Sequence, residues 1–448
     1  MSYNLTTMQS IYHNQDEIVE ITYNNSSVYH KSSGPDYTEP FYVENISNEN
    51  ETLNIVKSAD AAPTLEIEYS TDKTTWNTFG TTSTTALTRT LAPGDKVYLR
   101  CNTNAWAINY NYNKISGTSK VGGNIMSLLY GSNFTGEETS FQSGSTYIFN
   151  RLFDSNNRLI DASKLLLPAT TLASNCYNNM FSGCTSLTSA PALPATTLAS
   201  TCYLQMFYGC TALTTAPALP ATTLTERCYA NMFQECTSLT TAPELPATTL
   251  ASSCYANMFN GCTSLTTAPE LPATTLASSC YDNMFMGCTS LTSAPALPAT
   301  TLTERCYSGM FMGCTSLTSA PALPVTTLAA NCYAYMFRDC TSLTTAPELP
   351  ATTLASSCYD NMFMGCTSLT TAPALPATTL TERCYSNMFR GCTILNSVTC
   401  LAETTASNAT GNWLRGVSSA GTFTKSSNAT FWRTGVSGIP NNWTVIEV

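Results

Sequence analysis

The hydrophobic positions of the chain follow one repeating order over more than half of its length. Cysteine, aromatic and methionine positions recur every 26 residues in nine copies, each close to LPATTLASSCYxNMFxGCTSLTTAPE. In one copy, residues 254–262 place apolar side chains at relative positions i, i+1, i+4, i+5 and i+8. This spacing predicts a short helix with one wide apolar face. A fixed period of this length is typical of a solenoid, in which stacked copies bury together what one copy cannot bury alone.

The rest of each copy predicts a short strand and a return. Leu265, Ala268 and Leu271 are the expected inward residues of a threonine-rich run that suits a strand. Pro269 has no N–H to donate, so the strand must be short or interrupted there. Three copies carry Thr-Leu-Thr-Glu before the helix, as in residues 301–304, which is the spacing of a capping box. We therefore expect a mixed, mainly α+β solenoid of strand, bend and short helix.

A different pattern precedes the array. Residues 38–112 contain six short β-type runs at a spacing of about 8–12 residues, which is typical of a small all-β sandwich. Residues 1–37 are polar, with one strand-like run EIVEITY, and are interpreted as an N-terminal attachment arm. We expect residues 113–163 to form a junction and an N-terminal cap turn. Nine repeats then occupy 164–400, and residues 401–448 are expected to form a C-terminal cap.

Composition and charge narrow the class of protein. The 448 residues have a net charge of −10, and only 11% are charged, against about 25% in ordinary soluble domains. Hydrophobic residues make up 43% of the chain, which excludes a charge-rich disordered protein. An acidic chain poor in lysine and arginine is not expected to bind nucleic acid. We find no run of about 18 apolar residues and no secretory signal, so we expect no membrane insertion. We also expect folding in a reducing cytoplasm, with a trimmed chain as the alternative.

Eighteen of the 20 cysteines form two rows, and the two cysteines of each copy are eight positions apart. A disulfide within a copy is disfavoured, because eight residues of helix separate the Cα atoms by about 12 Å and a bridge needs less than about 7 Å. Zinc is disfavoured too, since this spacing differs from that of structural zinc sites. We expect small buried hydrophobes, with sporadic disulfides or metal as the alternatives. We expect no cofactor.

No catalytic set is recognised in the sequence. The two histidines, His13 and His30, both lie in the polar N-terminal arm, and no phosphate-binding loop occurs. Glu244, Glu270 and Glu348 share one repeat position. We interpret them as a solvated surface row rather than as a pair of glycosidase carboxylates, and we expect no enzyme.

Two rows remain as a candidate binding surface. The strand row is polar and rich in hydroxyl groups, and would lie on the concave face that solenoids commonly use. Its candidate residues are Thr240, Thr241, Glu244, Thr266, Thr267, Glu270 and Glu348. The second row is the variable position of the expected helix and should be exposed, either as a contact stripe or through ordinary drift. Its candidate residues are Tyr208, Met286, Met312, Arg338, Met364 and Arg390.

The run MFxGCTSLTxAPxLPATTL resembles the BspA-like leucine-rich repeats. Phe259, Cys262, Leu265, Ala268 and Pro272 take the places of the family pattern, with one extra strand residue and alanine in place of isoleucine. The resemblance implies a right-handed leucine-rich-repeat array with parallel strands, and roles in adhesion and recognition rather than catalysis. Similar repeats occur on surface proteins of gut and oral bacteria, on parasites, and in phages of gut Bacteroides.

Three functional hypotheses follow. The first is a virion-associated structural and adhesion protein of a gut bacteriophage, of the fibre or decoration type, located on the virion surface. Its N-terminal region would contact other virion proteins, its solenoid would recognise a host cell-surface glycan or protein, and a homo-oligomer is compatible with this role. The second is a BspA-like adhesin on a bacterial cell surface. The third is an inert spacer.

Overall fold

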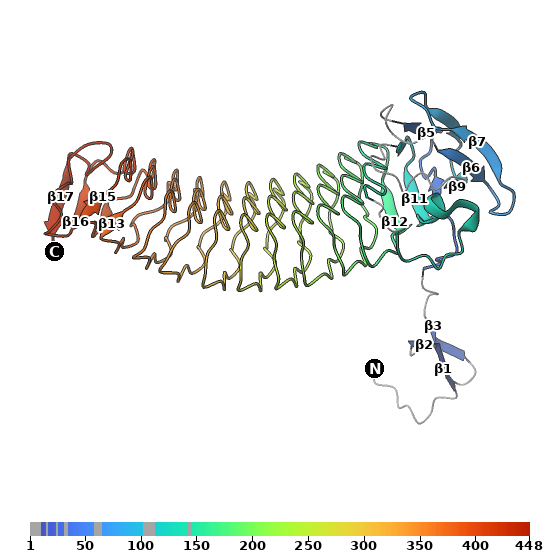
Figure 1. Ribbon diagram of the computed structural model, residues 1–448, viewed down its shortest axis with the longest axis horizontal. Helices are drawn as coiled ribbons and strands as arrows, with labels where there is room; N and C mark the ends of the chain where they lie inside the picture. Colours follow the sequence, from blue (N-terminus) through green and yellow to red (C-terminus); the bar gives the residue numbers. More distant parts are fainter. Residues whose placement is uncertain are drawn as a thin grey trace.

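A β-rich N-terminal unit is followed by a long solenoid that ends in a small parallel sheet (Figure 1). The computed structural model describes residues 10–14, 17–23, 26–30, 35–57, 65–101, 113–141 and 146–448. One continuous cluster of buried side chains runs from Phe41 in the N-terminal unit to Trp443 near the end of the solenoid. The N-terminal unit and the solenoid therefore share one hydrophobic core.

Two sheets build the N-terminal unit, one of six strands in the order β12-β11-β4-β9-β6-β7 and one of three in the order β10-β5-β8. Their bounds are β4 Tyr42–Glu44, β5 Glu51–Lys57, β6 Glu66–Ser70, β7 Asn77–Thr81, β8 Leu87–Leu91, β9 Lys96–Cys101, β10 Asn113–Ser116, β11 Lys120–Asn124 and β12 Asp161–Leu166. Each of the six predicted β-type runs overlaps one of the strands β4 to β9. The α-helix α1 (Ser127–Tyr130) and the 3-10 helix η3 (Gly131–Asn133) follow β11.

The two sheets reach past the predicted limit at residue 112. β10 pairs with β5, and β11 pairs with β4, both antiparallel. These strands were not expected because residues 113–124 carry little alternation of their own, and their pairing partners lie more than 50 residues earlier. Residues 102–112 of the predicted sandwich lie outside the described residues.

A separate antiparallel sheet precedes this unit, with strands β1 (Ser10–Asn14), β2 (Glu17–Tyr23) and β3 (Ser26–His30) in that order. The run EIVEITY forms β2, so its prediction as a strand is confirmed. The remainder of the predicted arm up to residue 34 lies outside the described residues.

Each 26-residue copy forms one coil, but the expected helix is not there. Among the described residues, α1 is the one α-helix and it precedes the array. Residues 253–262 instead have a positive φ at every fourth position, at Ser253 (53°), Asn257 (55°) and Gly261 (76°). We call these residues, and their equivalents in the other coils, the turn segment. The helical part of the α+β prediction is therefore wrong and the capping box does not start a helix, whereas the predicted array of 26-residue repeats is confirmed.

The hydrogen bonds of the turn segment explain the absence of a helix. Alternate N–H groups donate in two directions: Tyr255 donates to the carbonyl oxygen of Cys280 in the next coil at 3.0 Å, and Ala256 to that of Ser253, three residues back, at 3.2 Å. Half of the backbone N–H groups therefore donate to carbonyl oxygens of the neighbouring coil, whereas in a helix they would donate to carbonyl oxygens within the segment. Glycine and asparagine accept a positive φ most easily, and most coils have them at the second and third of these sites.

The predicted strand is reduced to single-residue parallel bridges between coils. Thr241 bridges Thr267, and a second row of bridges passes through Thr249. We call residues 241–249 and their equivalents the proline segment. Pro243 lies between the two rows of bridges and has no N–H to donate, so the predicted interruption of the strand is confirmed.

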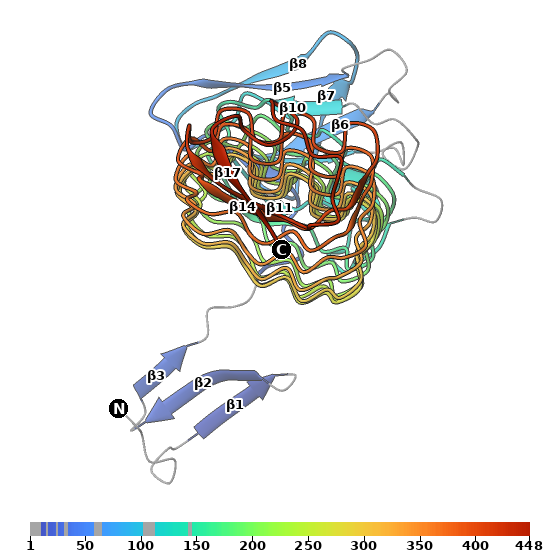
Figure 2. The ribbon, with the colours of Figure 1, turned by 90° about the vertical axis from the view of Figure 1, so that its left-hand side faces the viewer.

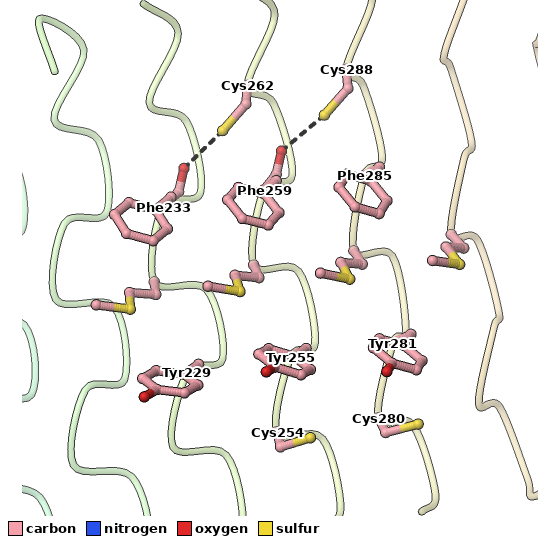
Figure 3. Packing of buried hydrophobic residues seen from close by; sticks show 14 of the residues in the cluster. Tyr229, Phe233, Cys254, Tyr255, Phe259, Cys262, Cys280, Tyr281, Phe285 and Cys288 are labelled. Atoms are coloured by element: carbon pink, nitrogen blue, oxygen red, sulfur yellow. Dashed lines mark hydrogen bonds between the residues drawn. The ribbon is translucent and has the colours of Figure 1, made fainter. Parts of the chain in front are cut away.

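Ladders of identical side chains fill the solenoid (Figure 3). The rings of successive coils are stacked, with centroids 5.7 to 6.0 Å apart in the tyrosine ladder and 5.4 to 5.8 Å in the phenylalanine ladder. The second cysteine of each coil donates its thiol to a phenylalanine carbonyl of the preceding coil, as Cys262 does to Phe233 at 3.1 Å. The 18 repeat cysteines are buried free thiols, so their predicted burial is confirmed.

The N-terminal unit continues directly into the first coils. β12 pairs in parallel with β11, and Asp161 in β12 also bridges Ser189 in the array. Phe153, within the predicted N-terminal cap turn, stacks on Phe181 at 5.2 Å and extends the phenylalanine ladder. The end of the ladder is thus covered by protein at this side.

A parallel sheet closes the other end (Figures 1 and 2). It has the order β14-β16-β17, and a two-stranded sheet of β13 and β15 lies beside the last coils. The bounds are β13 Thr379–Leu380, β14 Ser397–Cys400, β15 Thr404–Thr405, β16 Gly421–Lys425 and β17 Trp443–Glu447. Trp413 stacks on Tyr385 at 6.3 Å and ends the tyrosine ladder with a larger ring.

Candidate binding surface

Exposed threonines and glutamates form a row along the proline segments. All candidate residues of the strand row are exposed, namely Thr240, Thr241, Glu244, Thr266, Thr267, Glu270 and Glu348. The backbone sets their spacing, because Thr241 bridges Thr267 and the Thr240 N–H donates to the Thr214 carbonyl at 3.3 Å. Equivalent side chains of successive coils are therefore held in register, one coil apart.

Shallow grooves open between neighbouring proline segments. Glu244 and Glu270 line one groove of about 520 Å³, together with four prolines of the two coils. Glu348 lines a second groove of about 330 Å³, and a third of about 490 Å³ has Ala192 and Ala218 at the glutamate positions. Proline has no N–H, so these residues donate no backbone hydrogen bond to the neighbouring coil, and the grooves lie along this line.

The second candidate row lies on the turn segments and is half-buried, not exposed as predicted. Its residues are Tyr208, Met286, Met312, Arg338, Met364 and Arg390. Their carbonyl oxygens accept hydrogen bonds from the preceding coil, as Met286 does from the Gly261 N–H at 2.7 Å. On a helix these side chains would have pointed to solvent. In the stacked turns Met286 instead contacts its equivalent in the preceding coil, since the Asn260 Nδ2 lies 3.8 Å from its Sδ.

The repeat thiols are unreactive at neutral pH. Burial raises the pKa of the Cys262 thiol to about 12, and that of the Cys314 thiol to about 12. A thiol reacts and binds metal as its thiolate, so these groups are not available for either role at neutral pH. Within the described ranges, no three His, Cys, Asp or Glu side chains come close enough to hold a metal ion.

The sequence interpretation missed two features of the surface, although each corresponds to a recognisable residue pattern in the repeat. The grooves follow from two prolines placed three residues apart, as at Pro269 and Pro272, a pair that occurs eight times along the array. The turn segments follow from the Asn and Gly four residues apart, as at Asn257 and Gly261, which are the residues that tolerate positive φ.

A stack of near-identical coils with repeated exposed groups defines a solenoid repeat protein. The chain matches the BspA type leucine-rich repeat region, a model of six copies, over residues 174–292, 201–344 and 309–409, which together span more than half of it. The chain therefore belongs to the BspA-type leucine-rich repeat family, whose repeat proteins are in general non-catalytic. No curated protein and no solved structure matches it. In the part of the chain that the structure describes, no helix is long and apolar enough to cross a membrane.

Proposed function

We propose that the chain is a non-enzymatic adhesion protein whose solenoid binds a repetitive polymer, a glycan or a protein, on a cell surface. The observation that carries this proposal is the register of the proline segments. Exposed threonines return once per coil, and a groove lies between neighbouring coils, as at Glu244 and Glu270. A ligand with a regular repeat would meet the same chemical groups again and again along the array.

Repetition matters because each groove is shallow. A single groove with a few hydroxyl groups and one or two carboxylates would hold a sugar unit or a short peptide weakly. Several weak sites that engage one chain raise the overall affinity by about 10²–10⁴ over a single site. A polymer would therefore bind, while its short fragments would not.

Within this proposal, the chain is a virion protein of a gut bacteriophage, of the fibre or decoration type. Its N-terminal region contacts other virion proteins, and its solenoid contacts the host cell. The 18 buried free thiols support this role, since thiols stay reduced in the cytoplasm in which virion proteins are made. The family match favours a second candidate, a BspA-like adhesin on a bacterial cell surface. Mass spectrometry of purified particles distinguishes the two, because a virion protein copurifies with particles and an adhesin with cells.

The binding role is tested with the full chain and a shortened array. Removing residues 227–304 deletes three whole copies and joins Glu226 to Arg305, which restores the native Thr-Leu-Thr-Glu-Arg-Cys junction. The shortened array has lost three of its nine copies. We expect its affinity for bacterial surface polysaccharide to fall by much more than one third. Oligosaccharide fragments should bind neither protein measurably. Equal binding of the polysaccharide by the two proteins would show that the array is a spacer.

A further inference from the structure

A small pocket lies in the N-terminal unit, away from the proline segments. Its volume is about 250 Å³, smaller than the roughly 300–1,000 Å³ of pockets for drug-sized ligands. The side chains that give it its chemistry are Lys73, Trp76, Arg100, Ser132 and Phe134. They comprise two cations, two aromatic rings and one hydroxyl group, and the lining also includes the hydroxyl groups of Thr38 and Ser127, which already bond Asp36 and the backbone. No carboxylate lines the pocket among the described residues.

The loop that carries Lys73 and Trp76 is held in place by its own hydrogen bonds. The Asp72 carboxylate accepts from the Thr74 and Thr75 N–H groups at 2.8 and 2.7 Å. Lys73 has a φ of +67°, and the Trp76 indole N–H donates to its carbonyl oxygen at 3.2 Å. Because these bonds fix the loop, a ligand would meet a site that needs little ordering on binding.

Arg100 is oriented at the pocket by two contacts. Its Nε donates to Glu68 at 2.6 Å, and its guanidinium lies 4.2 Å from the centre of the Trp76 ring. Its terminal Nη groups make no hydrogen bond to any described residue. A guanidinium held in this way presents a planar pair of donors, which suits a carboxylate.

Both cations of the pocket also take part in ion pairs. Glu68 pairs with Arg100, and Glu39 pairs with Lys73 at 3.3 Å and with Lys96 at 2.8 Å. The Lys73 side chain is 43% exposed, so its pair with Glu39 is a weak surface pair that a ligand can replace. Neither glutamate lines the pocket.

We propose that this pocket binds the carboxylate of an acidic sugar unit, of the uronic acid type. The Arg100 and Lys73 donors would bind the carboxylate, the Ser132 hydroxyl would meet a sugar hydroxyl, and Trp76 and Phe134 would pack against the apolar C–H face of the ring. This site goes beyond the proposed function, because it lies outside the solenoid and gives the N-terminal unit a recognition role of its own.

The test is isothermal titration calorimetry of the full chain with glucuronate and galacturonate. Glucose and galactose serve as the neutral sugars, and acetate and inorganic phosphate as anions without a sugar ring. We expect heat of binding with one or both uronates, and binding of the neutral sugars and the small anions that is at least about tenfold weaker. Loss of a charge-assisted hydrogen bond of about 1.5 kcal/mol corresponds to that factor.

The deciding variant is K73G, with R227G as its matched control. Each removes one positive charge from a residue with positive φ, 67° at Lys73 and 52° at Arg227, where glycine fits the backbone without strain. K73G should weaken uronate binding about tenfold, and R227G, in the solenoid, should leave it unchanged. The proposal is overturned if no uronate binds, if glucose or acetate binds equally well, or if K73G binds as the natural chain does. Removal of residues 227–304 should not affect this site, which separates it from binding by the array.

Discussion

At the scale of single residues, the solenoid depends on positions that must adopt a positive φ. Most coils meet this need with Asn and Gly, but one coil has Tyr335 (61°) and Asp339 (59°) at the second and third sites. A left-handed conformation costs a residue with a Cβ roughly 1–2 kcal/mol, and bulky side chains tolerate it least. This coil therefore carries strain that its neighbours do not.

Replacing Tyr335 with Asn should stabilise the chain by about 1 kcal/mol, because the strain is relieved. The reverse change at the equivalent site two coils on, N387Y, should destabilise it by about the same amount. Both sites are half-buried and have positive φ, 61° and 51°, so the pair is matched. Urea unfolding followed by circular dichroism measures both changes. Shifts of the same sign in the two variants would contradict the explanation.

The buried thiols set an alkaline limit on stability. Burial raises the pKa of Cys262 from 9.0 to about 12 in the folded chain, so folding favours the protonated thiol. This contribution is complete below pH 9 and is lost as the pH rises toward 12, because only the unfolded chain can ionise its thiols there. We expect cooperative unfolding between pH 9 and pH 12, seen by circular dichroism.

Thiol titration provides the companion measurement. At pH 8 a thiol reagent should find few of the 20 cysteines in the native chain and nearly all of them in guanidinium chloride. Rapid reaction of the native chain would show that the cysteine rows are accessible, and the burial argument would then fail.

At the scale of elements, one coil is a module whose two neighbours are nearly the same as itself. Its turn segment donates alternate N–H groups to the next coil, and its tyrosine and phenylalanine rings stack on those of both neighbours. Stability in such arrays is close to a sum of coil terms and interface terms. Whole coils can therefore be removed, whereas a fraction of a coil cannot.

Deletion of residues 227–304, which is three whole copies, should leave a folded protein with Tyr203 stacked on Tyr307. Deletion of residues 227–291, which is two and a half copies, should place a turn segment against a proline segment and disrupt both ladders. Calorimetry should show one cooperative transition of lower enthalpy for the first variant. The second should aggregate or melt at a much lower temperature. Similar melting of the two variants would contradict the modular description.

At the scale of the whole molecule, both ends of the array are covered. The N-terminal unit continues the bridges of the solenoid through β12, and the parallel sheet β14-β16-β17 follows the last coil. Trp413 covers Tyr385, and Trp432 in turn stacks on Trp413 at 5.4 Å. Without such covers, the open end of the core would be a large apolar patch.

Truncation after residue 400 should test the cover at the C-terminal end. It would expose the apolar end of the last coil, including Phe389, Cys392 and Leu395. The remaining coils should stay folded, since they keep their other interfaces, but they should associate end to end. Light scattering during size-exclusion chromatography would show oligomers, with the full chain as the control. A monodisperse, equally soluble truncated chain would contradict this role.

The amino-acid sequence by itself determined the period of the array and the identity of its buried residues. Cys254, Tyr255, Met258, Phe259 and Cys262 are all buried as the apolar spacing predicts. The β-type runs before the array all overlap strands. These features could be predicted because an apolar side chain has to leave water whatever backbone carries it.

Only the tertiary structure decided the conformation of the backbone that carries those side chains. The arrangement of the exposed groups follows from that conformation. The spacing of residues 254–262 fits a helix equally well, but the carbonyl groups that bind half of the N–H groups lie 25 residues further along, in the next coil. A local pattern contains no information about such partners. The same reason applies to β10 and β11, which pair with distant strands, and to the grooves and the Arg100 pocket, which exist only where separate segments meet.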